Sequence, residues 1–174
     1  MKIRESVAND KDAIQIVHQA AFGESEGETV SQLAIKLLED KNAQSILSLV
    51  AEQNSEIIGN IIFSPVNIEG IKGVSAYILA PLAVTNKFQR KGIGTKLINQ
   101  GIETLRNRGA DIVLVYGDPS YYTRTGFKAG HNLEAPYKLD YPEAWMAQEL
   151  VKGVLTQTQG VARCALPLNS PELW

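Results

Sequence analysis

Apolar residues follow two spacings along the chain, and stretches of the two kinds alternate. Short apolar runs bounded by turn-forming residues are typical of strands, whereas apolar residues at every third or fourth position are typical of helices. Helices are expected over residues 10–22, 28–39, about 92–108 and 142–150, with a short one beginning at Pro119; strands are expected at residues 3–4, 45–53, 57–66, 74–84, 111–116, 127–129 and 161–166. Strands 45–53 and 57–66 are expected to form an antiparallel hairpin, and an acidic loop that contains glycine separates the first two helices.

The chain is expected to form one continuous domain. No repeat, linker or low-complexity tract interrupts residues 1–174, so a single α/β domain is the simplest expectation. The part after about residue 131 is its less well-defined C-terminal portion, because that part carries no transferable motif.

A loop with two glycines joins strand 74–84 to the helix that follows. It reads Gln89, Arg90, Lys91, Gly92, Ile93, Gly94 and Thr95. The N-terminus of a helix offers unpaired N–H groups and the positive end of the helix dipole, and both suit a phosphate. Residues without side chains at positions 92 and 94 let a ligand approach the backbone. The sequence therefore predicts a loop that binds pyrophosphate.

Two common phosphate-binding patterns do not fit this loop. A nucleoside-triphosphate loop ends in Gly-Lys-Ser or Gly-Lys-Thr, but here Thr95 precedes Lys96 and Gln89 stands where the first glycine belongs. A dinucleotide fingerprint needs a third glycine, and Leu97 occupies its place. Triphosphate hydrolysis and hydride transfer therefore both lose support.

The remaining pattern resembles motif A of the GNAT family of N-acetyltransferases. Gln89, Gly92 and Gly94 fill the three fixed positions of [QR]-x-x-G-x-[GA]. A second segment, residues 121–127, matches the family's aromatic-Tyr-x-x-x-Gly-Phe signature through Tyr122 and Gly126. More narrowly, residues 64–66, 79–84 and 117–122 resemble the bacterial YhbS-type branch. The resemblance spans roughly residues 3–145.

The resemblance implies a fold, a cofactor and a reaction. The fold is α/β (α+β), a single GNAT-like domain with a central, mostly antiparallel mixed sheet flanked by helices. The reaction is transfer of an acetyl group from acetyl-CoA to an amine by direct attack. The residues implied to bind the cofactor are Leu82, Ala83, Val84, Gln89, Arg90, Lys91, Gly92, Ile93, Gly94, Thr95, Asp118 and Tyr122. Tyr122 is also implied to be the general acid that protonates the CoA sulfur.

Two positions depart from the family pattern. Many relatives carry a glutamate as general base where this chain has Ala80 and Pro81. A water chain, Glu26 or Glu28 could take that role, and the sequence does not choose among them. Many relatives also carry an asparagine that contacts pantetheine after the next strand, where this chain has the turn Gly117-Asp118-Pro119. Asp118 either hydrogen-bonds the cofactor or caps the tyrosine helix.

Composition limits the kinds of cofactor and partner that this chain is expected to bind. Cys164 is the one cysteine, so no internal disulfide forms, and His18 and His131 lack the spacing of a metal site. Net charge is −2 with scattered basic residues, which does not favour nucleic acid. No apolar stretch approaches the ~18 to 20 residues of a membrane span, and no secretory core begins the chain, so a cytoplasmic protein is expected.

Three functional hypotheses follow. The first is an N-acetyltransferase that acts on a small-molecule or protein amine. The second is a module that binds CoA or acyl-CoA as a sensor, with little or no turnover. The third is a subunit whose C-terminal tail builds an oligomer interface, which leaves a homodimer open. The acidic residues Glu24, Glu26 and Glu28 suit a cationic amine or form a solvated face.

Overall fold

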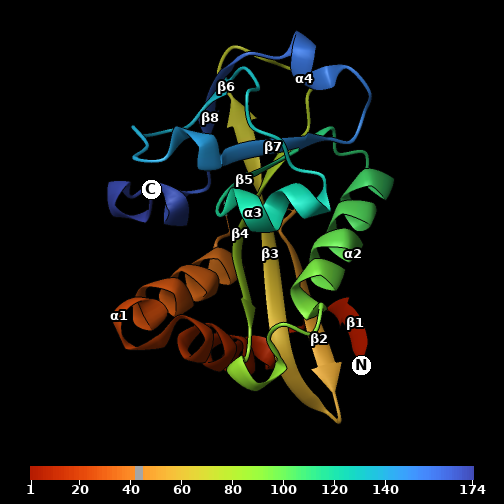
Figure 1. The fold of residues 1–174 in the computed structure, drawn as a ribbon, viewed down its shortest axis with the longest axis vertical. Helices are drawn as coiled ribbons and strands as arrows, with labels where there is room; N and C mark the ends of the chain where they lie inside the picture. The colour runs from red at the N-terminus through yellow and green to blue at the C-terminus, as the bar shows by residue number, and fades with distance from the viewer. Residues whose placement is uncertain (42–44) are drawn as a thin grey trace. The chain divides into compact units, whose positions relative to one another are not determined.

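The computed structural model describes residues 1–41 and 45–174, which form helices and strands of a mixed sheet (Figure 1). The helices are α1 (Lys11–Glu39), α2 (Ile93–Asn107), α3 (Pro119–Tyr122) and α4 (Val154–Gln157), and the strands are β1 (Lys2–Glu5), β2 (Leu47–Gln53), β3 (Glu56–Ile68), β4 (Ala76–Val84), β5 (Ile112–Tyr116), β6 (Leu133–Glu134), β7 (Trp145–Glu149) and β8 (Gly160–Arg163). Within the described residues the strand order is β1-β2-β3-β4-β5-β7, and β8 pairs with β3 and β6.

The sheet is mixed and mostly antiparallel, as the resemblance implied. The antiparallel pairs are β1 with β2, β2 with β3, β3 with β8 and β5 with β7. The pairs β4 with β5 and β6 with β8 are parallel. The described residues group into two compact units, one of residues 1–63 and 80–101 and one of residues 64–79 and 102–174. The expectation of a single domain stays a prediction.

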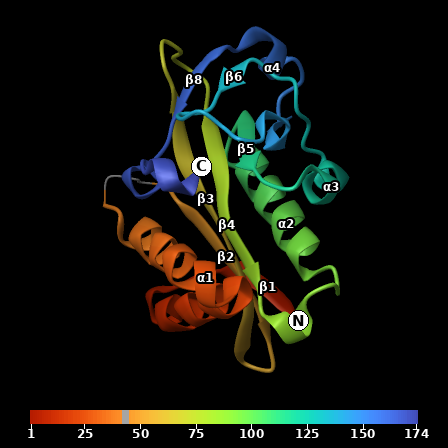
Figure 2. The same ribbon diagram turned by 60° about the vertical axis from the view of Figure 1, so that its left-hand side comes forward.

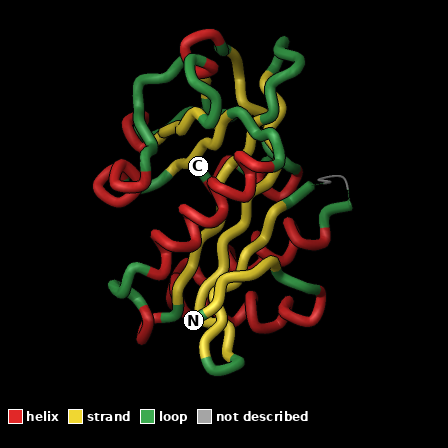
Figure 3. Tube along the Cα trace, turned by 90° about the vertical axis from the view of Figure 1, so that its right-hand side faces the viewer, coloured by secondary structure: helices red, strands yellow, loops and turns green. Residues whose placement is uncertain are grey.

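In the first unit, β2 and β3 form the expected hairpin. The turn that joins them is the short loop at the end of the two paired strands (Figure 3). Its two central residues, Asn54 and Ser55, have φ angles of 52° and 62°. Positive φ at both positions defines a type I′ turn, whose twist matches that of the flanking strands.

The first two predicted helices are one element, α1, which bends at Gly23 (Figure 2). Gly23 has φ 73° and ψ −167°, a conformation outside the helix. The acidic residues 24–28 are helical, so the predicted acidic loop was wrong apart from this one glycine. A Cβ on Gly27 would lie 2.5 Å from the carbonyl oxygen of Gln19. Gly27 therefore allows the second part of α1 to pack directly on the backbone of the first.

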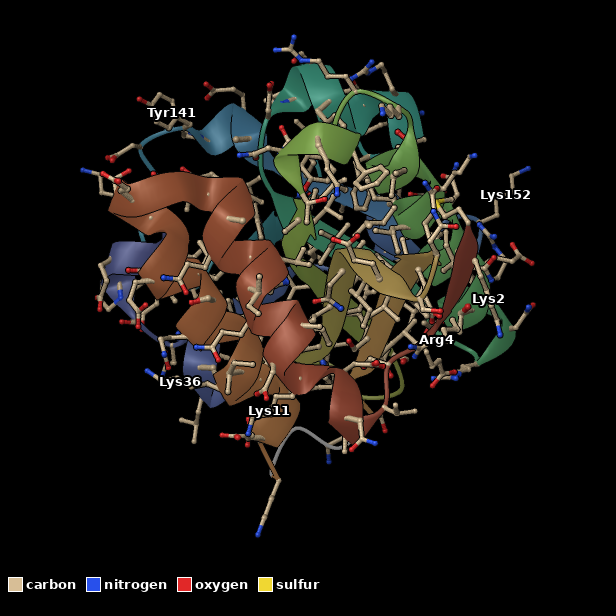
Figure 4. The ribbon with its side chains drawn as sticks, turned by 90° about the horizontal axis from the view of Figure 1, so that it is seen from below. Lys2, Arg4, Lys11, Lys36, Tyr141 and Lys152 are labelled. Carbon is tan, nitrogen blue, oxygen red and sulfur yellow. The ribbon has the colours of Figure 1, made fainter. Side chains whose placement is uncertain are left out.

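Arg4 of β1 links the first strand to the start of α1 (Figure 4). Its guanidinium donates to both oxygens of Asp10, at 2.7 and 3.1 Å, and its Nε donates to Glu52 at 2.8 Å. Asp10 also accepts from the Val7 N–H at 2.8 Å. The hydrogen bonds from Arg4 lower the pKa of Asp10, because they stabilise its carboxylate.

His18 lies in a buried polar chain between α1 and the β2–β3 hairpin. Its Nε2 is 2.8 Å from Asn60 Oδ1, and Asn60 Nδ2 donates to Ser48 Oγ and to the Leu49 carbonyl oxygen. The His18 side chain is fully buried, and burial lowers its pKa to about 4. The imidazole is therefore neutral in the folded protein, and Nε2 carries the proton that Asn60 accepts.

We expect the protein to become less stable as the pH falls, because the buried His18 must be neutral in the folded state. The unfolded chain binds a proton near the ordinary pKa of 6.5, whereas the folded one does so only near 4. The free energy of unfolding is thus highest above pH 6.5 and decreases by about 3 kcal/mol as the pH falls toward 4. Denaturant unfolding at pH 7, 5.5 and 4 measures the loss. His18→Gln, which cannot titrate, is expected to show a shallower decline, and equal slopes for both proteins would contradict this account.

Helix α2 packs closely on the sheet along the face that its spacing predicts. Its apolar residues Ile93, Leu97, Ile98, Ile102 and Leu105 are all buried. A Cβ on Gly101 would lie 2.2 Å from the ring of Phe63, a residue of β3 that is fully buried. Gly101 therefore lets the helix backbone rest on this aromatic ring.

In the second unit, β5 lies between β4 and β7, and the predicted helix 142–150 is wrong. Pro142–Ala144 form a single 3-10 turn, and residues 145–149 are β7, which pairs with β5 from Tyr116↔Trp145 to Ile112↔Glu149. The predicted strand at 127–129 is reduced to one bridge between Lys128 and Ala147. The predicted strand 161–166 is the shorter β8.

Trp145 and Met146 are core residues. They are 6% and 0% exposed, and the indole N–H of Trp145 donates to the Leu133 carbonyl oxygen at 2.9 Å. None of the helices in the described part of the chain combines the length and the apolarity that crossing a bilayer requires.

Candidate active site

The end of β4 carries the first three residues that the resemblance implies bind the cofactor, Leu82, Ala83 and Val84. Ala83 is buried, whereas Leu82 and Val84 are half-buried. A Cβ on Gly59 of β3 would lie 3.1 Å from the Leu97 side chain and 3.3 Å from the Ala83 carbonyl oxygen. Because Gly59 lacks that atom, β3, β4 and the start of α2 approach one another closely here.

Gln89 fixes the start of the glycine loop. Its Nε2 donates to the Val84 carbonyl oxygen at 2.9 Å and to Asn86 Oδ1 at 3.2 Å. The side chain thereby ties the loop back to the last residue of β4. This contact gives Gln89 a structural role, and its predicted contact with the cofactor stays a prediction.

Two residues of the loop have left-handed backbone conformations. Arg90 has φ 61° and Gly92 has φ 80°. Left-handed turns of this kind orient backbone N–H groups into a concavity that binds anions. The helix α2 then begins at Ile93, and its first N–H groups, which include those of Gly94 and Thr95, have no acceptor within the helix. The loop therefore presents N–H donors and the positive end of a helix dipole, as a pyrophosphate requires.

Two lysines add positive charge beside these donors. The ammonium groups of Lys87 and Lys91 lie 5.1 and 5.3 Å from the centroid of the Phe88 ring. Lys87 is also 3.8 Å from the carboxylate of Glu56. Both lysines are exposed, so they raise the local positive potential in a chain whose net charge is negative.

We expect Gly92→Ala to weaken binding of acetyl-CoA by about five- to thirtyfold, because alanine resists a left-handed backbone by roughly 1 to 2 kcal/mol. A Cβ at position 92 meets no atom within 4 Å, so the conformation and not the space is the constraint. The free loop relaxes to avoid the strain and must regain it when the cofactor binds.

Calorimetric titration with acetyl-CoA measures this effect. Gly73→Ala is the matched control, because Gly73 also has a positive φ, of 81°, and open space around it. Equal affinities of the two variants would contradict the placement of the pyrophosphate on this loop.

Tyr122 of the second unit has a closely packed ring. The ring makes edge-on contacts with Tyr121 and Phe127 at centroid distances of 5.0 and 5.8 Å. A Cβ on Gly117 would lie 2.4 Å from Tyr122 Cε2, so the ring rests directly on the backbone of Gly117. Burial raises the pKa of the Tyr122 phenol, which therefore stays protonated at neutral pH. A protonated, fixed phenol suits a general acid.

Local hydrogen bonds hold the segment that carries Tyr122. Thr125 Oγ1 donates to the Tyr122 carbonyl oxygen at 2.9 Å, and the Phe127 N–H donates to the same oxygen at 3.3 Å. Gly126 has φ 97° and ends the turn. The backbone after the tyrosine is thus as constrained as its ring.

Asp118 caps the helix α3. Its Oδ1 accepts from the Ser120 N–H at 2.9 Å and from Ser120 Oγ at 2.8 Å. Of the two roles that the sequence left open, the structure shows the cap. A contact between Asp118 and the cofactor stays a prediction.

The general base has no single candidate. Ala80 and Pro81, on β4, have no titratable group. Glu26 and Glu28 lie on the helical second part of α1 and are exposed, and Glu28 accepts from Gln32 Nε2 at 3.2 Å. A water chain, Glu26 and Glu28 therefore all remain.

His131 has a structural role. Its Nδ1 accepts from the Leu133 N–H at 3.2 Å, and its Nε2 lies 3.1 Å from the Trp145 carbonyl oxygen. Burial lowers the pKa of His131. Across residues 1–41 and 45–174, no group of three His, Cys, Asp or Glu side chains could hold a metal ion.

Gly59 and Gly117 are the site residues that sequence reasoning missed. Both are needed because another group approaches their backbone closely, and such an approach is not visible in local spacing. The position of Gly117 is the one available signal, since it stands between an apolar strand and the tyrosine signature.

The fold and both motifs place this chain in a known class: it belongs to the Acetyltransferase (GNAT) family, whose model matches residues 12–127. That range includes the glycine loop and the segment that carries Tyr122. The match confirms the family that the two motifs indicated.

Individual relatives agree. The chain is 38% identical to the uncharacterized N-acetyltransferase YjhQ of Escherichia coli over 165 residues, which cover 91% of this chain and 89% of that protein. The structure of Escherichia coli YhbS in complex with CoA has a TM-score of 0.88 and 27% identity, covering 97% of this chain and 92% of that one. A GNAT acetyltransferase of Brucella melitensis in complex with acetyl-CoA has a TM-score of 0.78 and 30% identity, with 96% and 97% covered.

These similarities confirm the predicted fold, the acyltransferase class and acetyl-CoA as the cofactor. They do not assign roles to single residues. The site residues named above therefore stay predictions.

Proposed function

We propose that this chain acetylates a primary amine, of a small molecule or of a protein, by direct attack on the donor, with Tyr122 as general acid. The observation that carries the proposal is the phenol of Tyr122, held on the backbone of Gly117 with a raised pKa. The loop 89–95 and the start of α2 supply the N–H donors that would hold the pyrophosphate, and the backbone of residues 82–84 would hold the pantetheine arm.

Bound acetyl-CoA supplies the thioester carbon, where a C–N bond forms as the C–S bond breaks. Only about one in 2500 amine groups with a pKa near 10.4 is neutral at pH 7, so a proton must leave the attacking nitrogen, to water or to a carboxylate. The hydroxyl of Tyr122 gives its proton to the departing sulfur. The nitrogen loses a second proton once the C–N bond has formed, also to water or to a carboxylate. The phenol recovers a proton from solvent, so that the complete reaction of an ammonium releases one proton.

Cys164 supports direct attack over a covalent acyl-enzyme. It is the one cysteine of the chain, and burial raises its pKa to about 12. A thiol that stays protonated is a poor nucleophile, because the thiolate is the reactive form. The acetyl group therefore passes to the amine without resting on sulfur of the protein.

The alternative, a sensor that binds CoA or acyl-CoA without turnover, is not favoured, since the family and the relatives are acetyltransferases. From the sequence we also propose a cytoplasmic location, a homodimer and a bacterial origin. We further propose that the partner is an amine acceptor and not nucleic acid, which the net charge of −2 supports.

An amine panel tests the proposal. The purified protein is incubated with acetyl-CoA and each amine in turn. Mass spectrometry then quantifies the acetylated amine and the free CoA in the same mixture. We expect both products in equal amounts, and only with amine present. Binding of acetyl-CoA without either product would support the sensor instead, and CoA released without acetylated amine would mean hydrolysis.

A further inference from the structure

The second unit contains a pocket of about 420 Å³ beside the segment that carries Tyr122. Gly117 both lines this pocket and lies against the Tyr122 ring. The volume falls in the range of small-molecule sites, about 300 to 1,000 Å³. The residues that line it include three aromatic ones, Tyr116, Tyr141 and Trp174, and three acidic ones, Asp118, Asp140 and Glu143.

One wall of the pocket is aromatic and rigid. Tyr116 stacks on Trp174 with a centroid distance of 6.0 Å and an interplanar angle of 16°. The indole N–H of Trp174 donates to the Leu168 carbonyl oxygen at 2.9 Å, and its ring contacts Trp145 edge-on at 5.6 Å. These contacts hold the wall in place before any ligand binds, which lowers the entropic cost of binding.

Tyr141 extends the aromatic surface to the rim. Its backbone N–H donates to the hydroxyl oxygen of Tyr116 at 3.3 Å, which ties the rim segment to the end of β5. Its side chain is 65% exposed and projects outward (Figure 4). The face of an exposed aromatic ring is available to a cation.

The pocket is negatively charged. Asp118, Asp140 and Glu143 are all exposed. Asp118 Oδ1 already accepts two hydrogen bonds from Ser120, so Asp140 and Glu143 are the carboxylates that a bound cation would use. None of the described residues that line the pocket is basic. Aromatic faces beside carboxylates bind ammonium or guanidinium groups, and no cluster in the described residues is suited to a metal ion.

Carboxylates stabilise the charged form of a bound amine, whereas the attacking nitrogen must become neutral to react, so these carboxylates are better suited to a second cationic group of the acceptor. We infer that the acceptor carries a second group that is cationic at neutral pH, an ammonium or a guanidinium, and that this pocket holds it against the aromatic wall and the carboxylates of Asp140 and Glu143. The inference rests on the proposed acetylation of an amine and names its substrate class: a diamine or a guanidino-amine.

The test compares two primary amines of similar length, agmatine, which carries a guanidinium, and pentylamine, which does not. We expect kcat/KM for agmatine to exceed that for pentylamine about thirtyfold, with about threefold from each of the two carboxylates and about threefold from the Tyr141 ring. In Asp140→Asn/Glu143→Gln the ratio is expected to fall to about three, through a roughly tenfold higher KM for agmatine. Tyr141→Leu is expected to raise this KM about threefold by removing the cation–π contact. Glu134→Gln, an exposed charge outside the pocket, is the control and should keep the wild-type ratio.

Calorimetric titration with agmatine separates this inference from the proposed function. Tight binding that weakens about tenfold in Asp140→Asn/Glu143→Gln, with no amine acetylated, would support the cation site in the pocket and overturn the proposed function. Acetylation of both amines with equal efficiency, unchanged in the variant, would overturn the cation site in the pocket and support the proposed function. Equal weak binding without acetylation would overturn both.

Discussion

Replacing Tyr122 with phenylalanine is expected to lower kcat about 100-fold and to change the Kd for acetyl-CoA by less than about twofold, since a general acid contributes roughly 10²- to 10⁴-fold. The ring contacts with Gly117 and Phe127 survive in the variant, because they involve ring carbons. The loss therefore isolates the hydroxyl. Steady-state kinetics with saturating amine measures kcat, and calorimetry measures Kd.

Tyr121→Phe is the matched control. Tyr121 is the adjacent tyrosine, and its ring lies against Tyr122 and under the guanidinium of Arg124, at 5.5 Å. Loss of its hydroxyl is expected to leave kcat within about twofold, since packing and not proton transfer is its role. An unchanged kcat in Tyr122→Phe would remove Tyr122 from the mechanism.

The pH dependence gives the same prediction a second readout. Burial raises the pKa of Tyr122 above its ordinary value of 10.0. An acid must be protonated to act, so a raised pKa keeps it active as the pH rises. The kcat profile of the wild type is therefore expected to show no fall caused by Tyr122 below about pH 10. A falling limb near neutral pH that disappears in Tyr122→Phe would contradict this.

Gly117→Ala is expected to lower kcat about tenfold or more, because it displaces the Tyr122 ring. The added Cβ would lie 2.4 Å from Cε2 and 3.0 Å from Cδ2 of that ring. Gly117 is not among the residues with positive φ, so alanine fits the backbone and the clash with the ring is the one change. A misplacement of about 1 Å at a reacting group can cost on the order of 100-fold.

A double-mutant cycle shows whether the loss acts through Tyr122. Once the hydroxyl is gone, its displacement no longer matters, so Gly117→Ala is expected to add little to the loss in Tyr122→Phe. Independent losses that multiply would mean that Gly117 affects kcat by another route.

The strand–loop–helix segments of the site were predictable because their signals are local. The apolar runs, Gly92 and Gly126 with their positive φ, and the cap by Asp118 all depend on neighbours within a few residues. The apolar face of α2 was likewise predictable, because it depends only on helical spacing.

The C-terminal part was predicted poorly because its structure depends on distant partners. β7 was expected to be a helix, but it is a strand because it pairs with β5, whose residues lie 29 to 37 positions earlier in the chain. Nothing within residues 145–149 signals that pairing. The aromatic wall of the pocket has the same origin, since Tyr116 and Trp174 are brought together only by the fold.

The bend in α1 shows another limit of prediction from sequence. Glycines and acidic residues between positions 23 and 28 indicated a loop, yet only Gly23 leaves the helix. Gly27 is needed for close contact with the backbone of Gln19, so its glycine reflects packing and not a turn. Composition alone does not separate these two reasons for a glycine.

Initial-rate kinetics with both acetyl-CoA and the amine varied tests the central claim most directly. Direct attack requires both substrates on the protein at once, so double-reciprocal plots are expected to intersect. A covalent acyl-enzyme would release CoA before the amine binds, and parallel lines, the signature of a ping-pong mechanism, would contradict the account.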